Sequence, residues 1–97
     1  MSAMLAKLIG TDAVLPEAAG SLLVAGLTAD SREVEPGFAF AALPGTKEDG
    51  AKYIGQAFAR GASVVIANEG SYSGAGLVIE TANPRQLFAR MAARFFG

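Results

Sequence analysis

Short apolar runs bounded by turn residues alternate with segments of helical spacing along this chain. The apolar runs predict four strands, at residues 22–27, 38–43, 63–67 and 77–80. Apolar side chains three or four positions apart predict three helices, over residues 2–9, about 50–60 and from 83 onward. Residues 11–20 carry mixed signals around a proline, so no regular element is expected there. The order of elements predicts a small single α/β domain over residues 1–97, with a mixed sheet of about four strands flanked by helices.

Local signals mark where these elements begin and end. Asn83 is the expected N-cap of the last helix, because Pro84 fits its first position and Gln86 can complete a capping box. Gly61 suits the left-handed conformation that often follows a helix. Two short polar side chains can cap the earlier helices, namely Ser2 and Asp49.

The run at 38–43 is the expected centre of the sheet, because it is apolar on both faces. A helix joins it to the β-branched run at 63–67. Such a crossover predicts that these two strands are parallel, with a right-handed connection.

Composition narrows the classes of function. Acidic and basic residues are interspersed and sum to a net charge of −1, which argues against a nucleic-acid surface. The chain has no Cys and no His, which removes disulfides, thiolate and imidazole catalysis and the usual zinc sites. No apolar run approaches the ~18 residues of a membrane span, and no secretory signal pattern is recognised. We therefore expect a cytoplasmic protein without a membrane partner.

Two polar segments follow the ends of predicted strands, where ligands gather in open α/β sheets. The first is Asp30-Ser31-Arg32 and the second is Thr46-Lys47-Glu48. Backbone groups of such loops can pair with the edge of a ring such as uracil, while a Ser hydroxyl and an Arg fork suit a ribose or a phosphate. The alternative is structural: Asp30 and Ser31 close a turn, and Arg32 pairs with a nearby glutamate on the surface.

Other sequence features give no catalytic or metal site. The chain lacks a Gly-x-x-x-x-Gly-Lys-Ser/Thr stretch, so no phosphate-binding loop of that type is expected. The glycines at 74 and 76 precede a strand rather than follow one, which indicates a loop. The loop carboxylates have no spacing that forces two of them together; they are Glu33, Glu35, Glu48 and Asp49.

From about residue 27 to 68, the order and spacing of motifs resemble the N-terminal domain of the Mur ligases. That family has Asp-Ser-Arg-x-Val-x-Pro-Gly, an apolar strand, Gly-x-x-x-Asp-Gly, a helix ending in Gly-Ala, and a valine-rich strand. The corresponding segments here are residues 30–37, 38–43, 45–50, 61–62 and 64–66. Ala39 and Ala41 differ, since larger aliphatic residues are usual there, and Thr46 stands where the family often has an aromatic residue or His.

The resemblance implies a domain that holds the uridine diphosphate end of UDP-N-acetylmuramoyl-L-alanyl-D-glutamate. By position, it implies substrate contacts at Ala29, Ser31, Thr46, Lys47 and Glu48, with Asp30, Arg32, Asp49 and Gly50 supporting the two loops. It also implies an ATP-dependent, amide-forming ligase of peptidoglycan precursor synthesis that adds a diamino acid. ATP and Mg²⁺ would be bound by central and C-terminal domains outside this chain, which alone would have no cofactor and no catalytic residue.

Two alternatives stay open on the sequence. The D-alanyl-D-alanine-adding Mur ligase has a similar N-terminal domain, although Asp-Ser-Arg together with Asp49-Gly50 favours the diamino-acid enzyme. A free-standing interaction module without a nucleotide ligand is the other. Two expectations can be compared with a structure directly. Ser31 should expose its hydroxyl to solvent close to residues 46–48, and Phe95 and Phe96 should be less buried than Leu87 and Met91.

Overall fold

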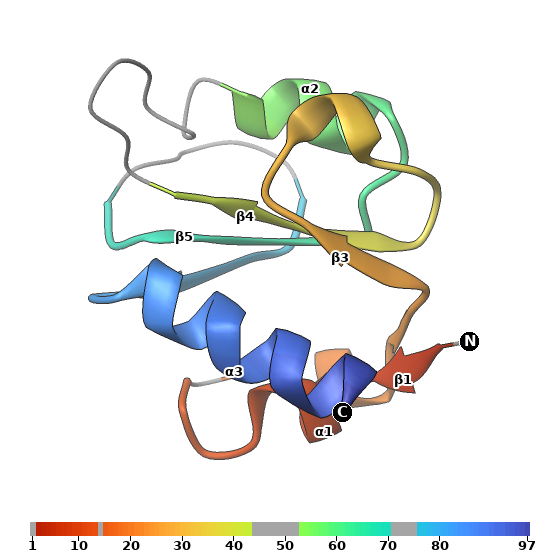
Figure 1. Ribbon diagram of the computed structural model, residues 1–97. Coiled ribbons are helices and arrows are strands. Elements are labelled where there is room, and N and C mark those ends of the chain that lie inside the picture. Colours follow the sequence, from red (N-terminus) through yellow and green to blue (C-terminus); the bar gives the residue numbers. More distant parts are fainter. Residues whose placement is uncertain (1, 14, 44–52, 71–75) are drawn as a thin grey trace.

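A four-stranded sheet forms the centre of the computed structural model, which describes residues 2–13, 15–43, 53–70 and 76–97 (Figure 1). Its strands lie side by side in chain order: β3 (Gly26–Thr28), β4 (Phe38–Ala42), β5 (Val64–Asn68) and β6 (Val78–Thr81). The α/β class, the four strands and the interior position of β4 confirm the predictions. All three pairings are parallel, however, so this sheet is not mixed.

The parallel pairing of β3 with β4 has a simple geometric cause. The connection between them is short, but β3 has only three residues, which span about 10 Å at ~3.3 Å per residue. The short 3₁₀ helix η2 (Ser31–Glu33) and the turn after it are enough to bring the chain back to the starting edge. A longer first strand would have favoured an antiparallel return.

A separate antiparallel ribbon explains why β3 is short. β1 (Ala3–Met4) pairs with β2 (Leu23–Val24), so the predicted strand at 22–27 is divided between two sheets. The division falls at Ala25, whose N–H donates to the carbonyl oxygen of Gly37 at 2.9 Å. Beyond that residue the chain pairs with β4.

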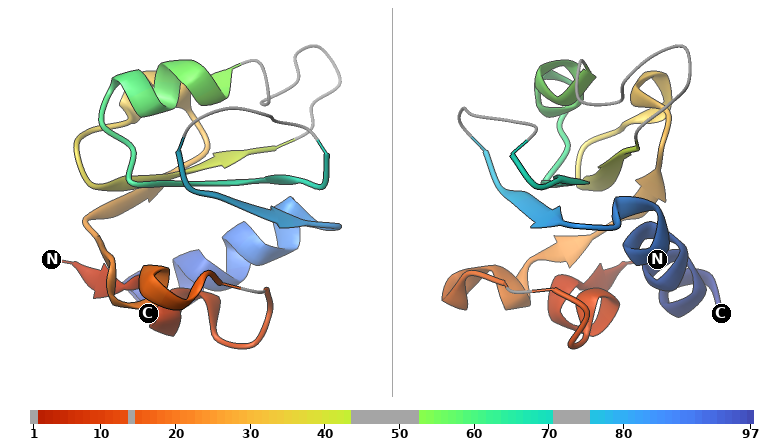
Figure 2. Two further views of the ribbon diagram at one scale, coloured as in Figure 1. Left: turned by 180° about the vertical axis from the view of Figure 1, so that it is seen from behind. Right: turned by 90° about the vertical axis from the view of Figure 1, so that its left-hand side faces the viewer.

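Helices cover both faces of the parallel sheet (Figures 1 and 2). α1 (Leu5–Ile9) and α3 (Pro84–Phe96) lie on one face, and α2 (Ile54–Ala59) and η2 lie on the other. Two buried clusters correspond to these layers. The first includes Leu5, Leu8, Ile66, Leu87 and Met91, and the second includes Val34, Phe40, Ile54, Ala57 and Val65.

Most predicted helix ends are confirmed where the structure describes them. Asn83 caps α3, since its Oδ1 accepts from the N–H of Gln86 at 3.1 Å, and proline occupies the first turn. Gly61 follows α2 with a φ of +105°. The expected cap Asp49 and the expected beginning of the second helix near residue 50 lie outside the described residues. The helix over 54–59 corresponds to the rest of that prediction.

The N-terminal helix was predicted three residues too long. It begins at Leu5, because Ala3 and Met4 are extended and pair with β2, so Ser2 is not its N-cap. A 3₁₀ helix, η1 (Glu17–Ser21), occupies part of the stretch where no regular element was expected. Pro16 comes immediately before it, which fits the preference of proline for helix beginnings.

The last turn of α3 exposes an aromatic ring. Phe96 is 67% exposed and Phe95 is half-buried, whereas Leu87 and Met91 are 3% and 0% exposed, so the expected difference in burial is confirmed. The two Phe rings meet edge to face with centroids 4.8 Å apart. No helix in the described part of the chain has the length and apolar character needed to cross a membrane.

Candidate functional site

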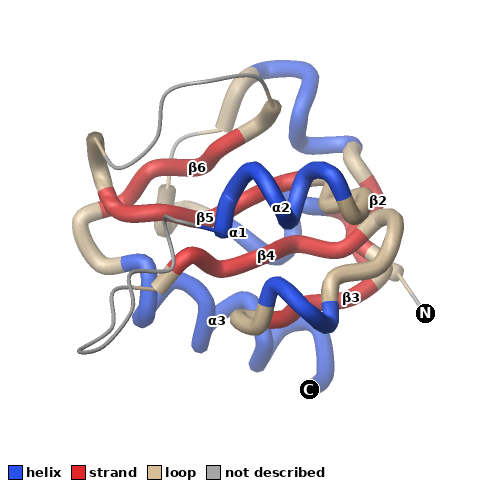
Figure 3. Tube along the Cα trace, turned by 90° about the horizontal axis from the view of Figure 1, so that it is seen from above, coloured by secondary structure: helices blue, strands red, loops and turns tan. Residues whose placement is uncertain are grey.

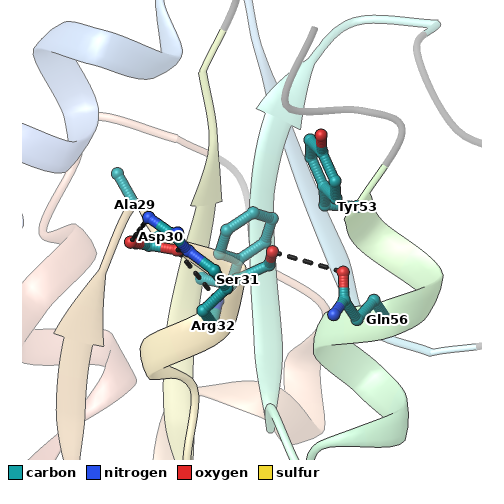
Figure 4. Close-up of a pocket in the computed structure, with 7 residues that line it drawn as sticks. Ala29, Asp30, Ser31, Arg32, Tyr53 and Gln56 are labelled. Atoms are coloured by element: carbon teal, nitrogen blue, oxygen red, sulfur yellow. Dashed lines mark hydrogen bonds and ion pairs between the residues drawn. The ribbon is translucent and has the colours of Figure 1, made fainter. Parts of the chain in front are cut away.

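A pocket of about 680 Å³ lies between η2 and α2 on one face of the sheet. α2 passes over β4 and β5 on this face (Figure 3), and residues from three segments of the chain meet at the pocket (Figure 4). The lining residues are Ala29, Asp30, Ser31, Arg32, Phe40, Tyr53 and Gln56. The first four follow the carboxyl end of β3, the position at which parallel α/β sheets commonly bind ligands.

Hydrogen bonds from Thr28 shape the turn that leaves β3. The Oγ1 of this buried threonine accepts from the N–H of Asp30 at 3.0 Å and lies 3.2 Å from Oε1 of Glu33, to which it donates. Asp30 then caps η2, because its Oδ1 accepts from the N–H of Arg32 at 2.9 Å. The polar segment is therefore held in a defined conformation by its own side chains.

Asp30 and Arg32 also form an ion pair at the rim of the pocket. Nε and Nη2 of Arg32 donate to the two carboxylate oxygens of Asp30 at 3.1 and 2.9 Å. The hydrogen bonds from the Arg32 side chain, followed by the one from its backbone, hold the pKa of Asp30 below its usual range. Arg60, directly after α2, donates from Nη2 to the carbonyl oxygen of Arg32 at 2.9 Å, so η2 and α2 are tied together.

The expectation that the Ser31 hydroxyl would be open to solvent is wrong. Ser31 is only 7% exposed, and its Oγ donates to Oε1 of Gln56 at 3.4 Å. The cause is α2, whose pocket-facing side lies against η2 and covers the serine. The partner is a side chain across the pocket rather than the local backbone, so Ser31 does more than close its own turn.

The structure brings the first predicted segment together and adds residues from elsewhere. Ala29, Asp30, Ser31 and Arg32 all line one pocket. The second predicted segment lies outside the described residues, so its approach to this pocket stays a prediction; it comprises Thr46, Lys47, Glu48, Asp49 and Gly50.

Sequence reasoning missed three lining residues: Phe40, Tyr53 and Gln56. Phe40 is 1% exposed and belongs to the core beneath the pocket, so its pattern indicates only a buried strand. Tyr53 and Gln56 have a detectable signal, because they are three positions apart around the beginning of a predicted helix. They lie beside its apolar stripe and therefore share one side of it.

The pocket is suited to binding a flat, polar molecule. Tyr53 supplies partly exposed aromatic surface beside the buried Phe40, and the serine, the amide and the ion pair supply donors and acceptors at the edge of the pocket. An apolar floor with a few placed polar groups is the usual composition of small-molecule sites. Within the described residues, no group of three His, Cys, Asp or Glu side chains is arranged to hold a metal ion.

Comparison with known proteins identifies the family. Residues 23–95 match the family described as "Mur ligase family, catalytic domain". The chain belongs to the Mur ligase family. The match includes β3, β4, the lining residues of the pocket and most of α3.

Several similar Mur ligases carry the name UDP-N-acetylmuramoyl-L-alanyl-D-glutamate--2,6-diaminopimelate ligase. The one from Rhizobium meliloti (strain 1021) is 45% identical over 80 residues, covering 81% of this chain and 16% of the relative. The one from Mesorhizobium japonicum is 46% identical over 97 residues, covering 94% of this chain and 20% of the relative. The chain thus spans between a sixth and a fifth of the length of these relatives.

Solved structures of Mur ligases share the fold. MurF from Acinetobacter baumannii superposes with a TM-score of 0.76 and 23% identity, covering 97% of this chain and 21% of that protein. MurF ligase from Thermotoga maritima, solved in complex with ADP, has a TM-score of 0.61 and 26% identity over 68% of this chain and 15% of that protein. These similarities support the expected α/β architecture.

Proposed function

We propose that this chain binds the uridine diphosphate end of UDP-N-acetylmuramoyl-L-alanyl-D-glutamate on behalf of a ligase that adds 2,6-diaminopimelate. The observation that carries the proposal is the pocket that Ser31 shares with α2, at the carboxyl end of β3. The partly exposed ring of Tyr53 suits a pyrimidine, and the polar edge of the pocket suits the hydrogen-bonding groups of a nucleotide. The names of the 45–46% identical relatives supply the rest of the substrate.

Within such a ligase, we assign this chain the role of the N-terminal, substrate-binding domain. The relatives are about five times longer, which leaves room for the expected central and C-terminal domains. The ligase would use ATP to activate the glutamate carboxylate for attack by the amine of the diamino acid. A reaction that consumes ATP and a UDP-linked precursor favours the cytoplasm, and the immediate partners of this domain would be the substrate and the other domains.

ATP and Mg²⁺ do not fit the part of the chain that the structure describes. Its sequence contains no Gly-x-x-x-x-Gly-Lys-Ser/Thr stretch for the phosphates. Among the described residues that line the pocket, Asp30 has the one carboxylate, and Arg32 donates to both of its oxygens. We therefore assign both cofactors to other parts of the ligase.

The D-alanyl-D-alanine-adding ligase remains the second candidate. The superposition on MurF from Acinetobacter baumannii favours it, but at 23% identity that likeness concerns the fold. The relatives at 45% and 46% identity are diaminopimelate ligases, which favours the first candidate. Both candidates require a UDP-linked substrate.

Ligand-observed NMR of the 97-residue chain with uridine diphosphate and with ATP tests the proposal. We expect saturation transfer to the uracil and ribose protons of uridine diphosphate, and no ATP turnover above a buffer control. Adenosine diphosphate serves as the control for unspecific binding of a nucleotide diphosphate. Equal transfer to both diphosphates, or none to either, would favour an interaction module instead.

A further inference from the structure

The pocket side of α2 presents Gln56, a residue that the packing of the helix does not require. Ile54 and Ala57 are both 0% exposed and fix α2 to the sheet. Gln56 lies between them in sequence but is exposed, on the side that faces η2 (Figure 4). Its contact with Ser31 is therefore separate from the attachment of the helix.

The hydrogen-bonding capacity of the two side chains shows what their contact leaves available. A serine hydroxyl has one proton and two acceptor lone pairs, and a glutamine amide has one oxygen and two N–H donors. Ser31 donates its proton to Oε1 of Gln56. The lone pairs of the Ser31 Oγ thus remain as acceptors for a donor of the ligand.

The backbone around Ser31 is fixed by bonds that do not involve Gln56. Thr28 and Asp30 hold the turn through the N–H groups of Asp30 and Arg32. What those bonds leave free is the rotation of the Ser31 hydroxyl. The hydrogen bond to Gln56 restrains this rotation. Its oxygen–oxygen distance of 3.4 Å is longer than the usual ~2.7–2.8 Å, so the bond can shorten when a ligand binds.

We propose that Gln56 is a positioning residue for substrate binding, which holds the Ser31 hydroxyl in the orientation that accepts a hydrogen bond from the nucleotide. This inference rests on the function proposed above. It assigns to α2 a part in nucleotide binding that does not depend on contact between Gln56 and the ligand. Removing the amide should weaken binding only while Ser31 is present.

A double-mutant cycle tests this role with uridine diphosphate as the probe. The variants are Ser31→Ala, Gln56→Met and the two combined, in the 97-residue chain. Methionine keeps the length of the side chain but lacks the amide. Gln86→Met is the matched control, because Gln86 is also exposed and lies in the first turn of a helix, α3, on the other face of the sheet. The dissociation constant and the melting temperature are measured for each variant.

We expect Gln56→Met to raise the dissociation constant about threefold to tenfold, as for one neutral hydrogen bond. In the Ser31→Ala background the same change should have no further effect, and Gln86→Met should bind like the unsubstituted chain. The melting temperatures of Gln56→Met and Gln86→Met should be unchanged, and that of Ser31→Ala should fall only slightly. Unaltered binding by Gln56→Met, or losses that multiply in the double variant, would overturn the positioning role alone. If the unsubstituted chain fails to bind uridine diphosphate, the proposed function itself falls.

Discussion

The guanidinium of Arg94 donates from Nη1 to the carbonyl oxygen of Leu8 at 2.8 Å and so joins the last helix to the first. The same nitrogen lies 3.1 Å from the carbonyl oxygen of Ile9. These two residues end α1, where carbonyl groups lack partners within the helix. A helix of only five residues is marginal by itself, so its end depends on this cation from α3.

Arg94→Ala should lower the free energy of unfolding by about 1–2 kcal/mol, because charge-assisted hydrogen bonds to two backbone carbonyls are lost. Urea denaturation followed by circular dichroism measures the change. Arg90→Ala is the control. Both arginines form an ion pair with Asp12, but in the described part of the chain only Arg94 also donates to the carbonyl groups of α1. An equal effect of the two substitutions would show that the carbonyl bonds contribute nothing beyond the ion pair.

Asp12 should make stability depend on acid pH. Hydrogen bonding to Arg94, and then to Arg90, lowers its pKa in the folded chain. A lowered pKa means that the stabilising contribution is complete above the unfolded value of about 3.9 and is lost as the pH falls through the lower folded value. The difference in melting temperature between the unsubstituted chain and Asp12→Asn should therefore be largest near neutral pH and shrink below about pH 4. A difference independent of pH would contradict this assignment.

Thr28→Val should destabilise the turn that carries the candidate site. The valine has the shape of threonine but leaves the N–H of Asp30 without its 3.0 Å acceptor, which costs about 1–2 kcal/mol when the group is buried. Thr28→Ser keeps the hydroxyl and should retain most of the stability. Ser31→Ala should have a smaller effect on stability than Thr28→Val, because its bond to Gln56 is long. If Ser31→Ala is the more destabilising substitution, Ser31 is chiefly a structural residue.

Replacing two glycines by alanine, one near the beginning of α2 and one just after its end, should change the free energy of unfolding in opposite directions. Gly61 has a φ of +105°, and a Cβ there would lie 2.8 Å from Cα of Pro36, so Gly61→Ala should cost at least about 1–2 kcal/mol. Gly55 is helical, and no described atom outside its own helix and chain neighbours lies within 4 Å of the added carbon, so Gly55→Ala should stabilise by about 0.5–1 kcal/mol. Thermal denaturation of both variants checks the pair, and a loss at Gly55 would show an unsuspected contact.

The features predicted well from the sequence are those with a local cause. The cap at Asn83, the positive φ of Gly61 and the buried strand at 64–68 each follow from side-chain chemistry within a few residues. The division at Ala25 could not be predicted, because it depends on two partners distant in sequence, β1 and β4. Nothing local in the apolar run distinguishes its two halves.

Only the part of the candidate site that has a local cause could be predicted from the sequence. The Asp30-Ser31-Arg32 segment is recognisable because turn chemistry and the motif coincide. The burial of Ser31 depends on how closely α2 packs against η2, and that distance follows from Ile54 and Ala57 filling the core. A helical pattern places Tyr53 and Gln56 on one side of α2, but only the packed structure shows that this side faces Ser31.

The sheet order has a consequence for how the chain folds. Because β3, β4, β5 and β6 are neighbours in the same order in which they are synthesised, each new strand docks on the one completed just before it. The first helix, in contrast, depends on a partner that is distant in sequence, because the bond from Arg94 to Leu8 joins residues 86 positions apart. Closing so long a loop is entropically costly, so this helix should become protected from hydrogen exchange only after the strands have assembled, although it is synthesised before them.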